Sequence, residues 1–172
     1  ALARHFDVVG FDIDTGRIDE LRTGHDRTEE IEAAALRESS LKLSFDSADL
    51  PGRDIYIVTV PTPVDADNQP DLGAVLGATK TAGRAIAGRA GGGAIVVYES
   101  TVYPGVTEDV CGPALAEASG LVCGADFFLG YSPERINPGD REHTVDRITK
   151  VVAGQTPDVT DILAEVYGRV TS

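Results

Sequence analysis

Residues 54–63 read DIYIVTVPTP, a nearly continuous apolar run closed by two prolines that flank a threonine. A run of this kind is typical of a strand that is buried on both faces in a parallel sheet. Downstream, residues 71–88 place apolar side chains at three- and four-residue intervals, which predicts an amphipathic helix. Residues 94–98 (AIVVY) then predict another buried strand. Such a strand–helix–strand unit predicts a right-handed crossover between parallel strands.

The same alternation of strands and helices extends in both directions along the chain. Toward the amino terminus the pattern predicts a strand at residues 7–12, followed by a short helix capped by Asp14 or Thr15. A surface helix is then predicted at residues 28–38 and an edge strand at residues 41–45. Toward the carboxyl terminus it predicts a helix near Pro104, two strands and a last helix opened by Asp158; the strands fall at residues 127–131 and 148–153. We therefore expect an α/β protein with a doubly wound parallel sheet in one domain.

The composition excludes several classes of partner. The 172 residues include 15 Lys+Arg and 28 Asp+Glu, a formal net charge of −13. Nucleic acids and anionic membranes are bound by clustered basic side chains, so we expect neither as a partner. The apolar runs are far shorter than the roughly 20 residues that cross a bilayer, and residues 1–12 lack the pattern of a signal peptide. We expect a cytoplasmic protein.

The cysteines and histidines do not predict a metal site. Cys111 and Cys123 fit neither a redox motif nor the paired spacing of zinc ligands. The three histidines are scattered among charged neighbours. Buried free thiols and no metal are the expectation.

Ligands of a doubly wound sheet bind at the carboxyl ends of its strands, so the residues after each predicted strand are the candidates. Asp12 stands where a carboxylate can accept hydrogen bonds from the ribose of an adenosine, although it can also cap the next helix. Ser100 and Thr101 can bind a carbonyl, a water or a phosphate, or cap a helix. Residues 131–140 (YSPERINPGD) hold a carboxylate, a guanidinium and an amide in a loop stiffened by prolines, which favours a binding site over a salt-bridged surface loop.

Five phrases, in order, resemble the amino-terminal domain of the UDP-glucose/GDP-mannose dehydrogenase family. They are VVGFDID (8–14), IVTVPTPVD (57–65), QPDL (69–72), VVYESTVYPGVTEDVC (96–111) and GYSPERINPGD (130–140). The last is similar to the branch that acts on UDP-N-acetylhexosamines for polysaccharide precursors. The resemblance implies a Rossmann-like NAD-binding domain, in an enzyme that oxidises the sugar C6 alcohol to a carboxylate with two NAD⁺.

The resemblance also implies roles on the cofactor side. Asp12 would hold the adenosine ribose, and Arg17 would lie near the adenine or phosphate edge. The adenosine side would be lined by Val60, Pro61 and Thr62. Ser100 and Thr101 would approach the nicotinamide, and Thr101 would also help to position the catalytic water.

On the substrate side, the resemblance implies that Glu134 serves as a base or water-orienting carboxylate. Arg135 and Asn137 would belong to the loop that binds the UDP-sugar. We expect Glu134, Thr101 and Asp12 to lie at one edge of the sheet, because each follows a strand of the same predicted sheet.

The sequence also departs from the family. It contains no GxGxxG loop and no counterpart of the family's first strand, and it stops before the helix and domains that carry the family's lysine and cysteine. Neither Cys111 nor Cys123 matches that cysteine, and Pro138 stands where UDP-glucose members have a second glutamate. We expect a truncated cofactor domain, with a homo-oligomer left open. A non-catalytic interaction or assembly module, and a phosphosugar enzyme of another reaction class, are the alternatives.

Overall fold

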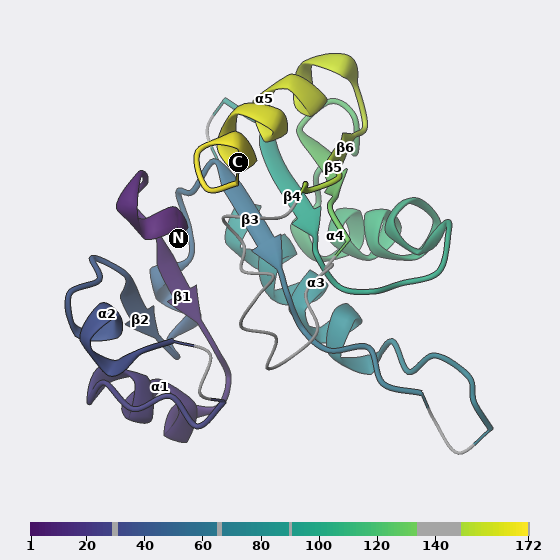
Figure 1. Cartoon of the computed structure of the whole chain (residues 1–172). Coiled ribbons are helices and arrows are strands. Elements are labelled where there is room, and N and C mark those ends of the chain that lie inside the picture. Colours follow the sequence, from purple (N-terminus) through teal and green to yellow (C-terminus); the bar gives the residue numbers. More distant parts are fainter. Residues whose placement is uncertain (29–30, 65–66, 90, 134–148, 172) are drawn as a thin grey trace. The chain divides into compact units, whose positions relative to one another are not determined.

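The computed structural model describes residues 1–28, 31–64, 67–89, 91–133 and 149–171 (Figure 1). These residues form two compact units. The first contains the described residues of 1–50, residue 149 and residues 168–171, and the second contains those of 51–133 and 150–167. No helix in these described ranges is both long and apolar enough to cross a membrane.

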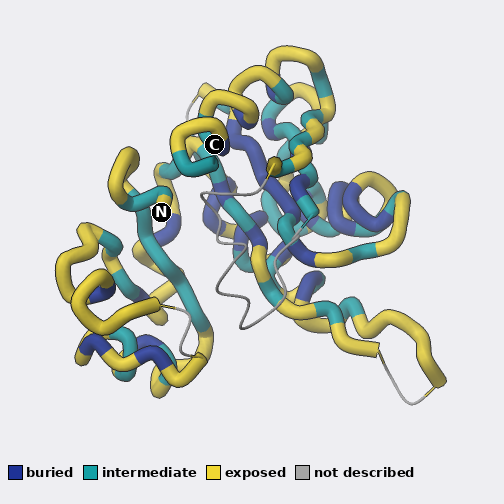
Figure 2. Tube along the Cα trace, in the orientation of Figure 1, coloured by how far each residue is buried: buried dark blue, intermediate teal, exposed yellow. Residues whose placement is uncertain are grey.

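The second unit is built on a four-stranded sheet in the order β3-β4-β5-β6. The strands are β3 (Ile55–Val58), β4 (Ala94–Tyr98), β5 (Phe127–Tyr131) and β6 (Ala153–Gly154). β3, β4 and β5 are parallel, with Ile55 opposite Ile95 and Ala94 opposite Phe127. Every residue of β4 is buried (Figure 2). A strand that is covered on both faces has apolar residues at every position, which explains its continuous apolar run.

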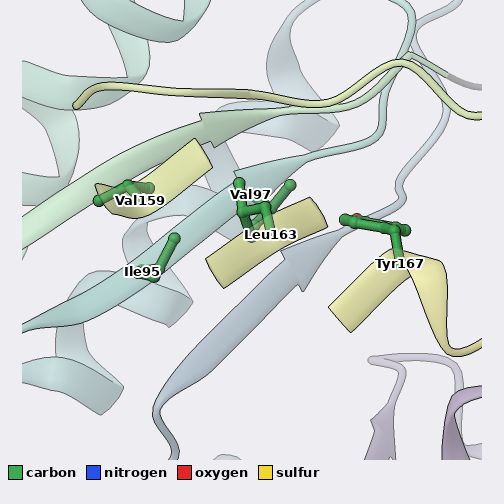
Figure 3. Close-up of a cluster of buried hydrophobic side chains, with 5 residues drawn as sticks. All are labelled: Ile95, Val97, Val159, Leu163 and Tyr167. Atoms are coloured by element: carbon green, nitrogen blue, oxygen red, sulfur yellow. The ribbon is translucent and has the colours of Figure 1, made fainter. Parts of the chain in front are cut away.

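Helices cover both faces of this sheet. On one face α5 (Pro157–Gly168) packs Val159, Leu163 and Tyr167 against Ile95 and Val97 of β4 (Figure 3). Tyr98 points to the other face, since side chains alternate along a strand.

On that other face the Tyr98 hydroxyl lies 3.0 Å from Thr79 Oγ1 of α3 (Gly73–Ile86). α3 packs closely on α4 (Gly112–Ser119), because a Cβ at Gly83 would lie 2.7 Å from Ala118 Cβ. The observed class is therefore α/β, as the sequence predicts.

The edge strand β6 corrects one expectation. A parallel strand was expected at residues 148–153, but β6 covers Ala153–Gly154 and runs antiparallel to β5. An antiparallel edge strand on an otherwise parallel sheet is common, and an apolar run in the sequence does not indicate the direction of its strand.

The first unit contains a two-stranded parallel sheet. β1 (Val9–Phe11) pairs with β2 (Lys42–Ser44), with Val9 opposite Lys42. Between them lie α1 (Thr15–Arg22) and α2 (Ala33–Arg37). Within the described residues α2 is shorter than the surface helix expected at 28–38. The unit also has 3₁₀ turns at Leu2–Arg4 and Ser47–Asp49.

Candidate functional site

The loops that follow β3 and β4 are cross-linked by two hydroxyl groups. Ser100, only 4% exposed, donates from Oγ to the carbonyl of Val60 at 2.6 Å. Thr62 donates from Oγ1 to the carbonyl of Thr101 at 2.5 Å. Because each hydroxyl hydrogen is used to hold the opposite loop, Ser100 and Thr62 can offer only lone pairs to a ligand. Their first effect is to fix the backbone around the exposed Thr101.

The predicted alternative of helix capping does not apply to Ser100 or Thr101. The next helical segment, Val106–Cys111, is a π-helical stretch that continues into α4. Gly105 occupies its N-cap position with φ 93°, and no side chain caps it. Ser100 and Thr101 therefore belong to the loop that follows β4 and do not cap a helix.

The end of β5 is tied to the same region of the second unit. Ser132 is fully buried and donates from its backbone N–H to the carbonyl of Tyr98 at 3.0 Å. Its hydroxyl donates to the carbonyl of Val151 at 2.8 Å. The predicted substrate residues that follow lie outside the described residues; they are Glu134, Arg135 and Asn137.

Sequence reasoning missed an ion pair beside these loops. Glu99 Oε1 lies 2.5 Å from Lys150 Nζ, and the two side chains are 18% and 11% exposed. The same ammonium lies 5.4 Å from the centre of the Tyr167 ring. Burial, followed by the charge of Glu99, raises the pKa of Tyr167, so its phenol stays protonated. The available signal was a single charged residue next to each apolar run, since a charge at the end of a buried strand needs a partner.

In the first unit Asp12 directly follows β1. Its backbone N–H donates to the carbonyl of Ser44 at 3.2 Å, and its Oδ1 accepts from the N–H of Asp14 at 2.9 Å. Asp14, not Asp12, is the N-cap of α1, because its side chain accepts from the N–H of Arg17. The neighbouring Ile13 is 84% exposed although it is apolar.

Arg17 is held by a buried carboxylate. Its Nη2 lies 2.5 Å from Oδ1 of Asp26, whose side chain is only 3% exposed. Asp26 also accepts from the N–H and hydroxyl of Thr28 and from the N–H of Ile31. Burial alone would raise the pKa of Asp26, but these hydrogen bonds outweigh burial and hold the pKa well below its usual range. The guanidinium is therefore fixed close to α1.

The residues around Asp12 in the first unit have the chemistry to bind the adenosine of a dinucleotide. The loop around Thr101 in the second unit has the chemistry to face its nicotinamide. A partly exposed carboxylate at the end of a parallel strand can accept bonds from a ribose diol. The exposed apolar Ile13 beside it offers surface to a planar base. In the second unit the fixed loop presents the exposed Thr101. No group of three or more His, Cys, Asp or Glu side chains that can hold a metal ion occurs in the described ranges.

The model of the UDP-glucose/GDP-mannose dehydrogenase family, NAD binding domain, matches residues 1–171. The chain belongs to this family. The resemblance read from the five phrases is thus confirmed, as is NAD as the cofactor of the family domain. The individual roles given to Asp12, Arg17 and Thr101 stay predictions.

Curated members of the family resemble the chain over nearly its whole length. It is 51% identical over 165 residues to Protein CapL of Staphylococcus aureus. It is 50% identical over 164 residues to UDP-N-acetyl-D-glucosamine 6-dehydrogenase of Pseudomonas aeruginosa. These alignments cover 96% and 95% of the chain, but the chain spans only 38% of the length of either relative.

Solved structures of the family share the fold. A UDP-D-ManNAc dehydrogenase from Pyrococcus horikoshii superposes with a TM-score of 0.86 at 29% identity, over 99% of this chain and 41% of that one. A ternary complex of GDP-mannose dehydrogenase from Pseudomonas aeruginosa gives a TM-score of 0.85 at 25% identity, over 98% and 40%. The Rossmann-like fold expected from the sequence is confirmed.

Cys111 and Cys123 are both free. Cys111 is buried as expected, and burial raises the pKa of its thiol. Cys123 is only half-buried, which corrects the expectation for that residue. Neither lies in one of the cross-linked loops described above.

Proposed function

We propose that this chain supplies the NAD-binding part of an enzyme that oxidises the C6 alcohol of a UDP-sugar, a UDP-N-acetylhexosamine, to the uronic acid for polysaccharide precursor synthesis. The observation that carries the proposal is the 50% identity, over 95% of the chain, to a protein named as a UDP-N-acetyl-D-glucosamine 6-dehydrogenase. Residues 1–172 are proposed as one cofactor domain, and the UDP-sugar as the substrate partner of the whole protein.

NAD⁺ supplies a hydride acceptor when it is bound. We propose that Asp12 accepts hydrogen bonds from the adenosine ribose through Oδ2, since Oδ1 already accepts from Asp14. Ile13 would contact the adenine, and the guanidinium of Arg17, fixed by Asp26, would lie near its edge. A free carboxylate repels a 2′-phosphate, so Asp12 favours NAD over NADP.

We propose that the loops of the second unit also contact the cofactor, at both its adenosine part and its nicotinamide part. Val60, Pro61 and Thr62 would line its adenosine part, and Ser100 and Thr101 would approach the nicotinamide. Ser100 and Thr62 act by holding the backbone, because their hydroxyl hydrogens already bond to carbonyls. The exposed hydroxyl of Thr101 is the one that can orient a water.

The chemistry of the substrate side is proposed from the family pattern. Glu134 would act as the base or water-orienting carboxylate, since oxidation beyond the aldehyde needs a water to be activated. Arg135 and Asn137 would bind the substrate. A homo-oligomer is compatible with this proposal.

The first experiment measures NAD⁺ binding to the 172-residue chain by saturation-transfer NMR and calorimetry. The sequence holds no GxGxxG loop, whose N–H groups hold the pyrophosphate, so we expect weak binding near 1 mM, which is about −4 kcal/mol. Asp12→Asn should weaken it about tenfold, because a hydrogen bond to a charged group is worth about 1.5 kcal/mol or more. Asp19→Asn, a change of the same type on the exposed side of α1, is the matched control and should leave it unchanged.

The second experiment follows NADH absorbance with UDP-N-acetylhexosamines and the protein encoded by the complete reading frame. We expect turnover with NAD⁺ and much less with NADP⁺. Absence of both NAD⁺ binding and turnover would instead favour the non-catalytic module. Equal use of NADP⁺ would contradict the role of Asp12.

A further inference from the structure

The ion pair between Glu99 and Lys150 has no part in the roles proposed so far. Glu99 directly follows β4 and precedes Ser100 and Thr101. Lys150 precedes β6. All of these residues belong to the second unit. Two segments that are distant in sequence are thus joined by opposite charges next to the proposed nicotinamide loop.

The ion pair is largely buried, so separating the two charges is costly. The two side chains are 18% and 11% exposed, and the atoms Oε1 and Nζ are 2.5 Å apart. Removing two charges from water costs several kcal/mol for each ion, so a pair of this kind adds little net stability. It strongly favours the arrangement in which the two side chains stay paired, because breaking the pair leaves an unpaired charge in a poorly hydrated place.

The ammonium of Lys150 is also anchored to the core of the unit. It lies 5.4 Å from the centre of the Tyr167 ring, a distance at which a cation is attracted to an aromatic face. Tyr167 is 4% exposed and belongs to the apolar cluster that α5 makes with Ile95 and Val97 (Figure 3). Lys150 is therefore held by a rigid support.

The carboxylate of Glu99 connects Lys150 to the loop that follows β4. The N–H of Glu99 donates to the carbonyl of Val58 at 2.8 Å, which extends the pairing of β3 with β4 by one residue. The next residues are cross-linked through Ser100 Oγ and the Thr101 carbonyl. On the other side, the carbonyl of Val151 receives the hydroxyl of Ser132. Each segment is bonded at its backbone, and the ion pair joins the two segments.

We propose that Glu99 and Lys150 are positioning residues: their ion pair holds residues 99–101 against the support formed by Tyr167 and so orients Thr101, with neither side chain touching substrate or cofactor. This inference rests on the proposed function for the role of Thr101. It predicts that the pair matters more to the order of the loop and to kcat than to folding.

The test separates positioning from stability with three variants. Glu99→Gln removes one charge and leaves Lys150 unpaired. Lys150→Arg keeps the charge and should preserve the pair. The double variant Glu99→Gln/Lys150→Met removes both charges, which commonly restores stability because no ion is left unpaired.

Amide hydrogen exchange of the 172-residue chain is the first readout. For the double variant we expect exchange of the amide of residue 99, which donates to the carbonyl of Val58, to accelerate about tenfold or more, while amides 95–98 of β4 change less than about twofold. Lys150→Arg should stay close to the parent. The control is Asp54→Asn, which breaks an ion pair of 2.6 Å with Arg89 at the amino-terminal end of β3 in the same unit and should leave exchange of the Glu99 amide unchanged.

The second readout uses the enzyme encoded by the complete reading frame. We expect kcat of the double variant to fall about 10- to 100-fold with KM changed little, since a small misplacement near reacting groups costs up to about 100-fold. Lys150→Arg should rescue most of the rate.

Unchanged exchange at the amide of residue 99 in a folded double variant would overturn the proposal, and so would a kcat within twofold of the parent. If the double variant does not fold, loss of protection in Lys150→Arg equal to that in Glu99→Gln would overturn it too. If the parent enzyme shows no turnover, the proposed function fails, and the exchange data still decide whether the ion pair orders the loop.

Discussion

Replacing Asp26 by Asn should destabilise the first unit, because its buried carboxylate accepts several hydrogen bonds. Asp26 Oδ1 accepts from Arg17 and from Thr28, and Oδ2 accepts from the N–H of Ile31 at 3.0 Å. An amide turns an N–H₂ group toward a donor in either orientation, so at least one hydrogen bond is lost. Arg17 also loses its buried counter-charge.

The cost can be worked from these contacts. A hydrogen bond to a charged group contributes about 1.5–3 kcal/mol, and breaking a buried ion pair costs about 3–5 kcal/mol. The Arg17 side chain is 20% exposed, so water recovers part of the second value. We therefore expect Asp26→Asn to lower the free energy of unfolding by about 2–4 kcal/mol at pH 7.

The effect should also depend on pH. The folded state holds the pKa of Asp26 below its ordinary value. A lowered pKa means that the stabilisation is complete above the unfolded-state pKa of about 4 and is lost as the pH falls toward the folded-state pKa. The difference between parent and variant should therefore be full at pH 7 and shrink below about pH 4.

Urea unfolding followed by circular dichroism, with hydrogen exchange of α1 to localise the change, measures both effects. The control is Asp19→Asn, whose side chain is 68% exposed and 3.4 Å from Arg22, and it should change the unfolding free energy by less than about 0.5 kcal/mol. A loss below about 0.5 kcal/mol in Asp26→Asn, or a loss that is equal at pH 3 and pH 7, would refute the reasoning.

Two further substitutions test the second unit. Leu163→Ala removes a fully buried side chain from the cluster on β4 and should cost about 2–5 kcal/mol in urea unfolding, whereas Ile162→Ala, at 45% exposure, should cost less than about 1 kcal/mol; similar costs would contradict the packing. Gly154→Ala places a Cβ 2.5 Å from the backbone nitrogen of Thr160 and should cost about 1–3 kcal/mol, whereas Gly77→Ala meets nothing within 4 Å and should add about 0.5–1 kcal/mol of stability; a neutral Gly154→Ala would contradict the close approach of β6 and α5.

Sequence patterns predict the centre of the second unit well. β3 lies within the run 54–60, and β4 and β5 coincide with their apolar runs, because a strand covered on both faces has to be apolar throughout. β6 was displaced and its direction was wrong, because two residues carry too little pattern to define a strand.

The elements of the first unit are less well predicted. α2 has only five residues, little more than one helical turn, and Leu36 is the one residue of this helix that is buried. A short surface helix depends on tertiary contacts rather than on its own propensity, so its ends are not written in a local pattern.

The site shows the same division between local and distant information. The position of Asp12, Ser100 and Thr101 after their strands follows from the sequence, because strand ends can be located from apolar runs. The partners of these residues do not, since a hydroxyl in the sequence carries no sign of which carbonyl it will meet. Asp26 and Lys150 were missed for this reason: each is defined by the partner that its charge meets in the fold, and the local pattern does not name that partner.

The cross-linked loops also show why a motif cannot be read as a set of equivalent ligands. Of the three hydroxyls at Thr62, Ser100 and Thr101, two donate to backbone carbonyls of the opposite loop. Removing one of these two changes the backbone that presents the third. A loss of activity in Ser100→Ala would therefore not show that Ser100 touches a ligand, whereas a loss in Thr101→Val, which keeps the shape and the backbone carbonyl that Thr62 bonds, would point to the hydroxyl itself. The distinction rests on which hydroxyls still have a hydrogen to donate, and this follows from the carbonyl that each hydroxyl contacts in the fold, which the motif does not reveal.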